Sequence, residues 1–123
     1  MVTTPVLFDT NILIDYLRGV TQARVECDGH SDRAVSIVTW MEVMAGSTPA
    51  NEPDARSFLL NFYTLRLDAS VAERAFLIRR ANRINLPDAI ILATAEASGR
   101  VLVTRNTRDF PPGTPGVRIP YTL

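Results

Sequence analysis

Three carboxylates occupy positions where their side chains could act together. Asp9 directly follows a short apolar run, Glu42 follows a second one at residues 34–39, and Asp88 follows Leu86-Pro87. If these runs are neighbouring parallel strands, the acids meet in one crevice at the carboxyl edge of the sheet, where open α/β sheets bind ligands. Two carboxylates about 4 Å apart repel each other by about 4 kcal/mol at an effective dielectric constant of about 20. A divalent cation relieves this repulsion, and the oxygen ligands favour Mg²⁺ or Mn²⁺. The pattern therefore predicts metal-dependent phosphodiester cleavage.

Each acid also has a purely structural interpretation. Asp9 is a plausible N-cap, Glu42 could close a capping box with Thr39, and Asp88 could favour the dipole of the helix that it opens. We expect all three to lie at the beginning of a helix. Their shared placement makes a joint role more plausible than three independent caps.

A fourth site group is expected from the loop after residues 101–103. Asn106 offers a neutral oxygen and lies nearer the strand end than Asp109, which could ligate a metal or cap a turn. We therefore favour Asn106 slightly over Asp109. Asp15 lies six residues after Asp9 and is expected to be a solvated helix charge, with a role behind the metal ligands as the second interpretation.

Apolar periodicity and turn residues predict one α/β domain spanning residues 1–123. Strands are expected at 6–8, 34–38, 65–67, 101–103 and 117–119, and helices at 10–17, 21–27, 39–46, 54–63, 70–85 and 87–99. Ser70 and Glu73 have the spacing of a capping box. The alternation predicts three α/β/α layers around a mainly parallel sheet of four to five strands.

Composition excludes several classes of protein. The chain has 123 residues, 46% of them hydrophobic, and no apolar stretch of about 18 residues that would predict a membrane span. The one cysteine, Cys27, cannot form an internal disulfide, and the start lacks the pattern of a signal peptide, so we expect a cytoplasmic protein. All 13 basic residues are arginine. Without lysine, a P-loop, a haloacid-dehalogenase-type phosphohydrolase and a receiver domain are all disfavoured.

The ordered set of motifs resembles the PIN-domain nucleases, and more narrowly the VapC ribonuclease toxins of type II toxin–antitoxin systems. The motifs are Phe8-Asp9-Thr10-Asn11, Thr39-Trp40-Met41-Glu42-Val43, Leu86-Pro87-Asp88-Ala89 and Thr104-Arg105-Asn106-Thr107-Arg108-Asp109-Phe110. The resemblance covers nearly the whole chain. It implies that Asp9, Glu42 and Asp88 are the metal-binding acids. The fourth family position is often Asp, whereas here it is Asn106.

The resemblance further implies an Mg²⁺- or Mn²⁺-dependent endoribonuclease that hydrolyses RNA with a metal-activated water. Its expected partners are RNA, a VapB-like antitoxin and a second copy of the chain in a homodimer, with no membrane. Two alternatives are a PIN nuclease of RNA processing outside a toxin–antitoxin system and a non-catalytic PIN-like binding module. Substrate contacts are expected from Thr10, Asn11, Thr104, Arg105 and Arg108.

Arginine is distributed unevenly along the chain. Residues 1–65 carry four arginines and eight acids, whereas residues 66–108 carry eight arginines and four acids. Arg79, Arg80 and Arg83 share a helix face at i, i+1 and i+4 spacing, where a solvated face is the first interpretation and RNA-backbone binding the second.

The remaining polar and aromatic side chains are expected to be structural. His30 is interpreted as a surface loop residue and Cys27 as packed in the interior. Trp40 is assigned to the core. The aromatic residues of the apolar helical stripes are assigned to the core or a dimer interface: Phe58, Phe62, Tyr63 and Phe76.

Overall fold

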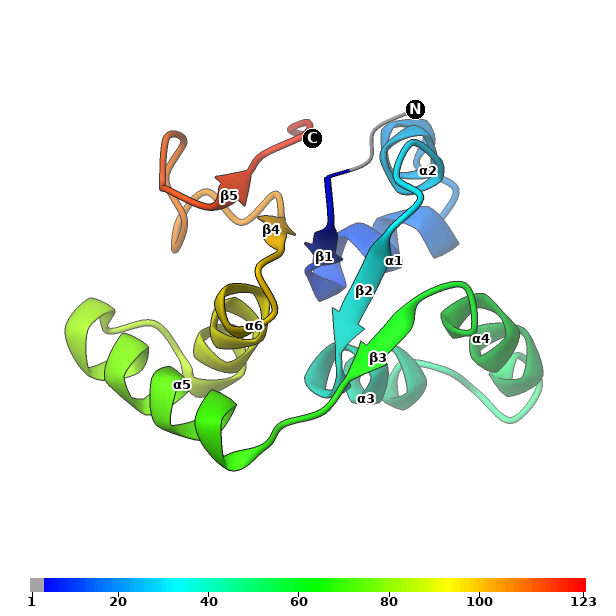
Figure 1. Cartoon of the computed structure of the whole chain (residues 1–123). Helices are drawn as coiled ribbons and strands as arrows, with labels where there is room; N and C mark the ends of the chain where they lie inside the picture. Colours follow the sequence, from blue (N-terminus) through cyan, green and yellow to red (C-terminus); the bar gives the residue numbers. More distant parts are fainter. Residues whose placement is uncertain (1–3) are drawn as a thin grey trace.

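Five short parallel strands form the centre of this chain, for which a computed structural model describes residues 4–123 (Figure 1). They are β1 (Val6–Phe8), β2 (Arg33–Ser36), β3 (Tyr63–Leu65), β4 (Val101–Val103) and β5 (Val117–Arg118). Their spatial order is β3-β2-β1-β4-β5, and every pairing is parallel. The predicted parallel sheet is confirmed.

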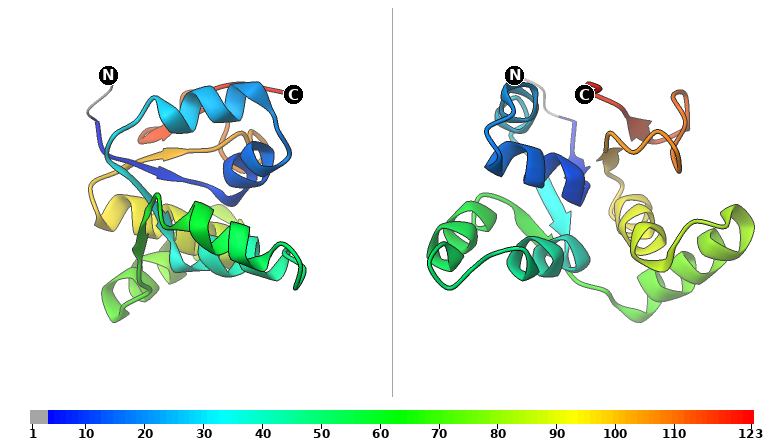
Figure 2. Two further views of the ribbon diagram at one scale, coloured as in Figure 1. Left: turned by 90° about the vertical axis from the view of Figure 1, so that its right-hand side faces the viewer. Right: turned by 180° about the vertical axis from the view of Figure 1, so that it is seen from behind.

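Six helices lie around this sheet within residues 4–123. They are α1 (Thr10–Leu17), α2 (Thr21–Asp28), α3 (Ile37–Ala45), α4 (Glu52–Leu59), α5 (Ala69–Asn82) and α6 (Leu86–Ala97). The α5–α6 pair lies on one side of the strands, and α1, α2 and α4 lie on the other, as the view from behind also shows (Figures 1 and 2). The three-layer α/β/α prediction is therefore confirmed. Over the described residues, no helix has the length and apolar character that crossing a bilayer requires.

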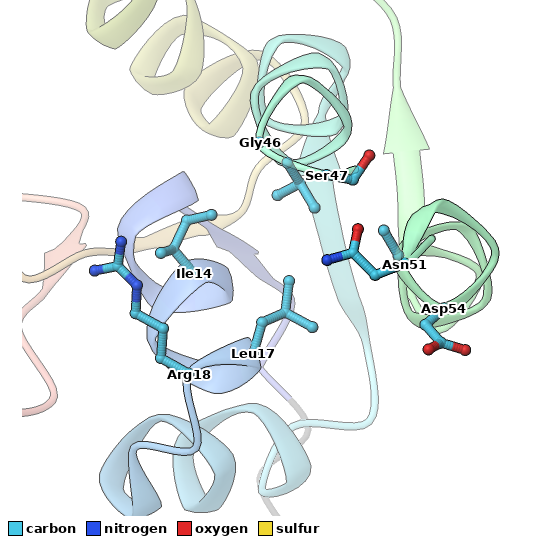
Figure 3. A pocket seen from close by; sticks show the side chains of 9 residues that line it. Ile14, Leu17, Arg18, Gly46, Ser47, Asn51 and Asp54 are labelled. Carbon is cyan, nitrogen blue, oxygen red and sulfur yellow. The ribbon is translucent and has the colours of Figure 1, made fainter. Parts of the chain in front are cut away.

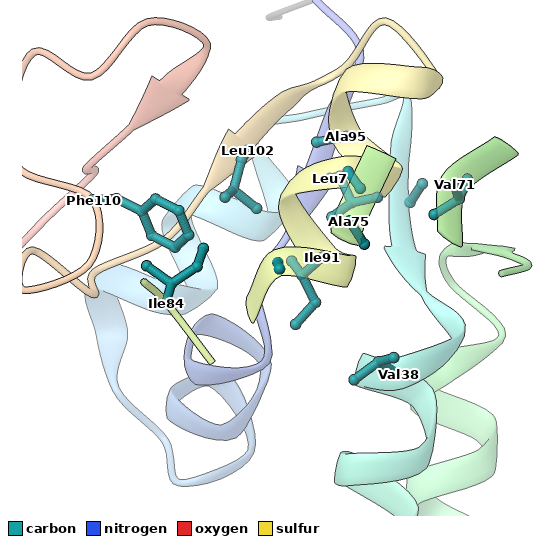
Figure 4. Close-up of a cluster of buried hydrophobic side chains, with 12 residues drawn as sticks. Leu7, Val38, Val71, Ala75, Ile84, Ile91, Ala95, Leu102 and Phe110 are labelled. Carbon is teal, nitrogen blue, oxygen red and sulfur yellow. The ribbon is translucent and has the colours of Figure 1, made fainter. Parts of the chain in front are cut away.

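Alternation along the strands divides the core in two. Leu7 packs with residues of α5 and α6, including Ala75 and Ile91 (Figure 4). Its neighbours Val6 and Phe8 pack in the opposite direction, against residues of α1 to α4. Successive strand side chains point to opposite faces of a sheet, so one buried strand serves both cores. Together the cores fix the position of the residue that follows β1.

The third helix begins earlier than the sequence predicted. The apolar run at 34–39 was interpreted as a strand followed by a helix from Thr39, but β2 ends at Ser36 and α3 starts at Ile37. The hydroxyl of Ser36 accepts a hydrogen bond from the backbone N–H of Val38 at 3.0 Å, which satisfies one free donor of the first turn. Ser36 is therefore the N-cap, and the predicted capping box of Thr39 with Glu42 is wrong.

Other predicted boundaries also shift. Helix α4 ends at Leu59 and Tyr63 begins β3, so the strand predicted at 65–67 lies two residues too late. Helix α5 is capped by Asp68, which accepts from Val71 N at 2.9 Å, and not by Ser70. It ends at Asn82 because Arg83 adopts a left-handed conformation with φ of 58°. This early stop leaves room for the turn that leads into α6.

Candidate active site

The end of β1 and the end of β4 bring Asp9 beside Thr104. Because Phe8 pairs with Val103, the next residue of each strand emerges at the same edge of the sheet. The Asp9 N–H donates to Val103 O at 2.8 Å, and the Thr104 hydroxyl donates to Asp9 Oδ2 at 2.8 Å. Asp9 Oδ1 accepts from Thr10 N at 2.7 Å, which makes Asp9 the predicted N-cap of α1. Both carboxylate oxygens of Asp9 are thus held by this edge.

Asn11 connects the first turn of α1 to the loop after β4. Its amide nitrogen lies 3.1 Å from Thr104 Oγ1 and 3.3 Å from Asp9 Oδ2. Its amide oxygen accepts from Arg105 N at 3.2 Å. Burial raises the pKa of Asp9, which is 4% exposed, while the hydrogen bonds from Thr104 and Thr10 act in the opposite direction. Asn11 therefore positions Asp9 and the loop, with its amide nitrogen and its amide oxygen each engaged inside the protein.

Glu42 reaches the same edge from the interior of α3. The Thr10 hydroxyl donates to Glu42 Oε1 at 2.6 Å, and Thr10 Oγ1 lies 2.9 Å from Thr39 Oγ1. A hydroxyl has one proton to donate, so Thr39 is the donor to Thr10. Thr39 is fully buried one helical turn before Glu42. The expectation that Glu42 stands at a helix start is wrong, because α3 already begins at Ile37.

Asp88 enters from the first turn of α6, and no strand precedes it in the structure. Asn85 caps this helix by accepting from Asp88 N at 2.9 Å. Burial raises the pKa of Asp88 to about 6, and the charge of Asp9, a hydrogen bond and the charge of Asp109, and the charge of Glu42 add to the rise. The charges of Asp9, Asp109 and Glu42 therefore all act on Asp88, after burial, in raising its pKa.

The loop after β4 presents Asp109 to Asp88 and uses Asn106 to hold it. The Asn106 amide nitrogen donates to Asp109 Oδ2 at 3.0 Å, and its oxygen accepts from Asp109 N at 3.2 Å. Asn106 N also donates to Thr104 Oγ1 at 3.0 Å. The slight sequence preference for Asn106 over Asp109 is therefore not supported by this geometry, because both amide groups of Asn106 are engaged inside the loop.

Arg105 is paired with Asp15, and its side chain is 31% exposed. Its guanidinium forms two hydrogen bonds with the Asp15 carboxylate, at 2.5 and 2.8 Å, and the Tyr121 hydroxyl donates to the same carboxylate at 2.8 Å. The bond from Arg105 is the main reason why the pKa of Asp15 is lowered. The Asp15 side chain is only 2% exposed, so its interpretation as a solvated helix charge is wrong.

The other predicted residues lie apart from these contacts. Arg108 has a side chain that is 88% exposed, with its Nε 3.8 Å from Asp109 Oδ1. His30 is 6% exposed and its Nε2 lies 2.9 Å from Glu26, so the surface-loop assignment is wrong. Cys27 is buried as predicted.

The aromatic assignments hold in part. Phe62 is buried, and Phe58 and Trp40 are partly buried against the same core. Tyr63 and Phe76 are 65% and 49% exposed, so they do not belong to the core, and the dimer interface stays a prediction for these two residues.

Two contributors were not foreseen from the sequence. Thr39 donates a hydrogen bond to the Thr10 hydroxyl, which in turn binds Glu42. The sequence signal for this role was the position of Thr39 one helical turn before Glu42. Tyr121 holds Asp15 across 106 residues of chain, for which the sequence carries no local signal.

The donor set suits a hard divalent cation. Asp9, Glu42, Asp88 and Asp109 supply carboxylate oxygens, which Mg²⁺ and Mn²⁺ prefer. Burial and the neighbouring negative charges both raise the pKa of Asp88, and a bound cation would favour its ionised form. Among residues 4–123, however, no three His, Cys, Asp or Glu side chains are already grouped closely enough to enclose an ion. Ion binding would therefore draw these acids together.

A separate hollow lies between α1, α3 and α4 (Figure 3). Its volume is about 390 Å³. It is lined by Ile14, Leu17, Arg18, Val43, Gly46, Ser47, Asn51, Asp54 and Ala55. None of the candidate metal ligands lines it, so it is a concave surface separate from the acids.

Comparison with known proteins agrees with this arrangement. Residues 6–111 match the family model described as "PIN domain". This chain belongs to the PIN-domain family. The matched range contains all four acids of the site and excludes Arg118 and Tyr121.

Relatives of this PIN domain cover most of its length. It is 33% identical over 114 residues to "Ribonuclease VapC10" of Mycobacterium tuberculosis, with 86% of each chain covered. A chain of a "Toxin-antitoxin complex from Klebsiella pneumoniae" is 42% identical with a TM-score of 0.91, and the match covers 96% of this chain and 99% of that one. A chain of DNA-bound VapBC from Salmonella typhimurium shares the fold, at 24% identity and a TM-score of 0.76 over 95% and 97% of the two chains.

Proposed function

We propose that this PIN domain is a metal-dependent endoribonuclease and acts as the toxin of a type II toxin–antitoxin pair. The observation that carries the proposal is that Asp9, Glu42 and Asp88 come from three separate elements to one edge of the sheet: Thr10 binds both Asp9 and Glu42, and burial together with the charges of Asp9, Asp109 and Glu42 raises the pKa of Asp88 to about 6. Similarity to a named VapC ribonuclease and to a toxin–antitoxin complex supports the same activity. Because RNA is the substrate, the proposed place of action is the cytoplasm.

In this proposal Asp9, Glu42, Asp88 and Asp109 hold Mg²⁺, with Mn²⁺ as a substitute. The chemistry that the cation supplies when bound is activation of water and stabilisation of negative charge on the phosphate and the leaving oxygen. Asn106 holds Asp109, and it takes the role of a positioning residue in place of the ligand role that its sequence position suggested.

The protein's own side chains prepare the site before metal or substrate arrives. Asp9 is fixed by Thr104 and Thr10, and Glu42 is oriented by the Thr10 hydroxyl. Below a pH of about 6, Asp88 holds a proton on its carboxyl group, which must leave before the group can bind a cation. Asp88 therefore links metal affinity to pH.

The attacking group in this mechanism is water and not the RNA 2′-hydroxyl. Catalysis by a pair of histidines needs two of them, and this chain has one. That residue, His30, is buried against Glu26, which also binds Arg118 at 2.7 and 2.9 Å. The cleavage products should therefore lack a 2′,3′-cyclic phosphate.

The test is incubation of the purified chain with total RNA, with Mg²⁺ or with a chelator, followed by mapping of the cleavage ends. We expect cleavage only with the metal and no cyclic-phosphate ends. Asp9→Asn serves as the inactive control, and Arg24→Gln, an exposed change on α2, serves as the active one. Equal cleavage by wild type and Asp9→Asn would contradict the assignment of Asp9 as a metal ligand of the nuclease.

We also propose that the chain forms a homodimer and that its antitoxin inserts a basic side chain among the acids. An arginine can pair bidentately with carboxylate oxygens and would compete with Mg²⁺. Truncating one member of such a buried pair costs about 2–5 kcal/mol, or roughly 30- to several-thousand-fold in affinity. Calorimetric titration of the antitoxin into wild type and Glu42→Gln measures this loss, and sedimentation measures the dimer.

A different docking mode would give a different result. If the antitoxin instead occupies the hollow of Figure 3, Leu17→Asp should weaken binding and Glu42→Gln should leave it unchanged. Leu17 is 45% exposed at the mouth of that hollow, so this substitution buries no new charge in the core.

A further inference from the structure

The carboxyl-terminal end of α5 carries a basic surface that contains no acid. An open hollow of about 400 Å³ is lined by Phe76, Arg79, Arg80 and Arg83 and is called here the α5 arginine surface. All four side chains belong to exposed residues. Within residues 4–123, none of the three arginines forms an ion pair with a carboxylate, whereas Arg56, Arg74 and Arg100 each do. The positive charge of this surface is therefore uncompensated.

An aromatic ring lies within this charge. The Arg80 guanidinium stands over the Phe76 ring, 4.7 Å from its centroid, and Phe76 is 49% exposed. Single-stranded nucleic acids are bound by surfaces that combine positive charge along the backbone with aromatic rings or guanidinium planes on which bases stack. This pairing of groups fits an unpaired RNA strand better than it fits a free anion, which needs no ring.

The surface adjoins the turn that carries Asp88. The Arg79 guanidinium donates to Ile84 O at 2.9 Å, and Ile84 directly precedes Asn85, the residue that caps Asp88 N. This short connection places the arginines beside the start of α6. A strand cut at the acids would have its neighbouring nucleotides within reach of α5.

Arg83 occupies a backbone position that suits glycine better. Its φ of 58° is the left-handed conformation that commonly ends a helix, and glycine adopts it without a steric penalty. Its side chain forms no ion pair among the described residues that would account for an arginine here. Binding of a ligand from solvent would explain why an arginine, and not a glycine, occupies this position.

We propose that the α5 arginine surface binds the single-stranded RNA that flanks the cleavage site, with Arg80 and Arg83 contacting phosphates and Phe76 with Arg80 stacking on a base. The inference rests on the proposed function, because it assigns a path to that substrate. It commits to RNA as the occupant on the grounds of charge and ring chemistry.

The test measures binding of a fluorescein-labelled single-stranded oligoribonucleotide to the full chain in chelator, where no cleavage is expected. Arg80→Gln and Arg83→Gly should each weaken binding severalfold and lower the slope of log affinity against log salt by about 0.7. Phe76→Ala should weaken binding by about fivefold or more. Duplex RNA of the same sequence should bind less tightly than the single strand.

Arg24→Gln is the matched control. Arg24 is also exposed and stands over an aromatic ring of a neighbouring helix, 5.1 Å from the centroid of Tyr16, but it lies on α2 and outside the surface. The substitution Arg24→Gln removes the same charge and the same type of stacking contact as Arg80→Gln. Arg83→Gly removes the steric cost of the left-handed backbone at this position, so the melting temperature of this variant should hold or rise. A loss of RNA binding in this variant could therefore not be assigned to unfolding.

Three outcomes would overturn the inference. In the first outcome, the RNA affinity and the salt slope of the three variants of this surface change no more than those of Arg24→Gln. Sedimentation could show that Phe76→Ala converts a dimer to a monomer, which would make this face a contact between copies. An acidic antitoxin peptide could compete at this surface while RNA does not bind it. If wild type binds RNA through this surface but never cleaves it, the proposed function fails and RNA binding by this surface stands. If wild type cleaves RNA and none of the three substitutions changes the cleavage, the proposed function stands and this inference fails.

Discussion

The two halves of the acid site are built differently. Asp9, at the end of β1, is 4% exposed and accepts hydrogen bonds from Thr104, Thr10 and Asn11. Asp88, at the start of α6, is half-buried, and the groups that act on it are the acids Asp9, Asp109 and Glu42. One half consists of a carboxylate surrounded by donors, and the other of a carboxylate surrounded by negative charge.

The difference indicates how one site can be both rigid and responsive. Hydrogen bonds between groups fixed by paired strands hold Asp9 with or without a ligand. Burial and the charges of neighbouring carboxylates disfavour the ionised form of Asp88, and a proton or a cation would offset this cost. In the proposed function, the strand half would set the geometry, and the helix half would set the dependence on metal and pH. Four predictions test this contrast.

The largest effect is expected from Asp9→Asn and Asp88→Asn compared directly. Each should lower RNA cleavage by about 100-fold or more, since each removes a charged ligand. Their stabilities should move in opposite directions without metal. Asn at position 9 places an NH₂ group against donors and should cost about 1–3 kcal/mol, whereas Asn at position 88 should stabilise because it removes repulsion. Chemical denaturation in chelator measures both, and a parallel shift would contradict the contrast.

Arg105→Gln should destabilise the strand half without touching the acids. Asp15 would lose its bidentate partner while 2% exposed, which should cost about 2–4 kcal/mol because an unpaired buried charge is left. Arg108→Gln is the control, since that side chain is 88% exposed and makes only a long contact. The two variants are compared by thermal unfolding. Equal melting temperatures would show that the Asp15 pair contributes nothing to stability.

The helix half should give the metal-free protein a dependence on pH. The pKa of Asp88 is raised from 3.8 to about 6, so its contribution to stability is complete below 3.8 and is lost as pH rises through about 6. Asp9, also raised, acts in the same direction, whereas Asp15 and Glu26, both lowered, act in the opposite one at lower pH. The wild-type profile sums these effects.

Subtracting two profiles isolates Asp88. The free energy of unfolding of Asp88→Asn minus that of wild type should rise between pH 3.8 and about 6 and stay level above, by about 1 kcal/mol after allowance for solvent screening. Urea unfolding across this range measures it. A difference that is constant with pH would mean that Asp88 titrates normally.

The smallest effect is expected from Tyr121→Phe. It removes one of three hydrogen bonds to Asp15 while Arg105 stays in place, which should cost about 1 kcal/mol. Cleavage should change little, because Asp9 and Thr104 keep their contacts. A loss of cleavage as large as that of Asp9→Asn would place the carboxyl-terminal segment in the site itself.

Local signals in the sequence were sufficient for much of this protein. The buried run at 6–8, the N-cap at Asp9 and the alternation of strands and helices predicted a parallel α/β/α fold, which the structure confirms. These signals work because they act over a few neighbouring residues, through side-chain alternation and the free N–H groups of a first helical turn. The expected position at a helix start was met by Asp9 and Asp88 but not by Glu42.

Contacts between distant segments were decided only by the tertiary structure. Arg105 and Arg108 look alike in sequence, but only Arg105 meets Asp15, which lies 90 residues away. The sequence favoured Asn106 slightly over Asp109, and only the folded loop shows that the Asn106 amide binds the Asp109 carboxylate. Glu42 lies within α3, and not at its start, because the helix begins at Ile37 and not at Thr39. A side chain's partner depends on strand register and helix packing, which residue type and spacing do not specify.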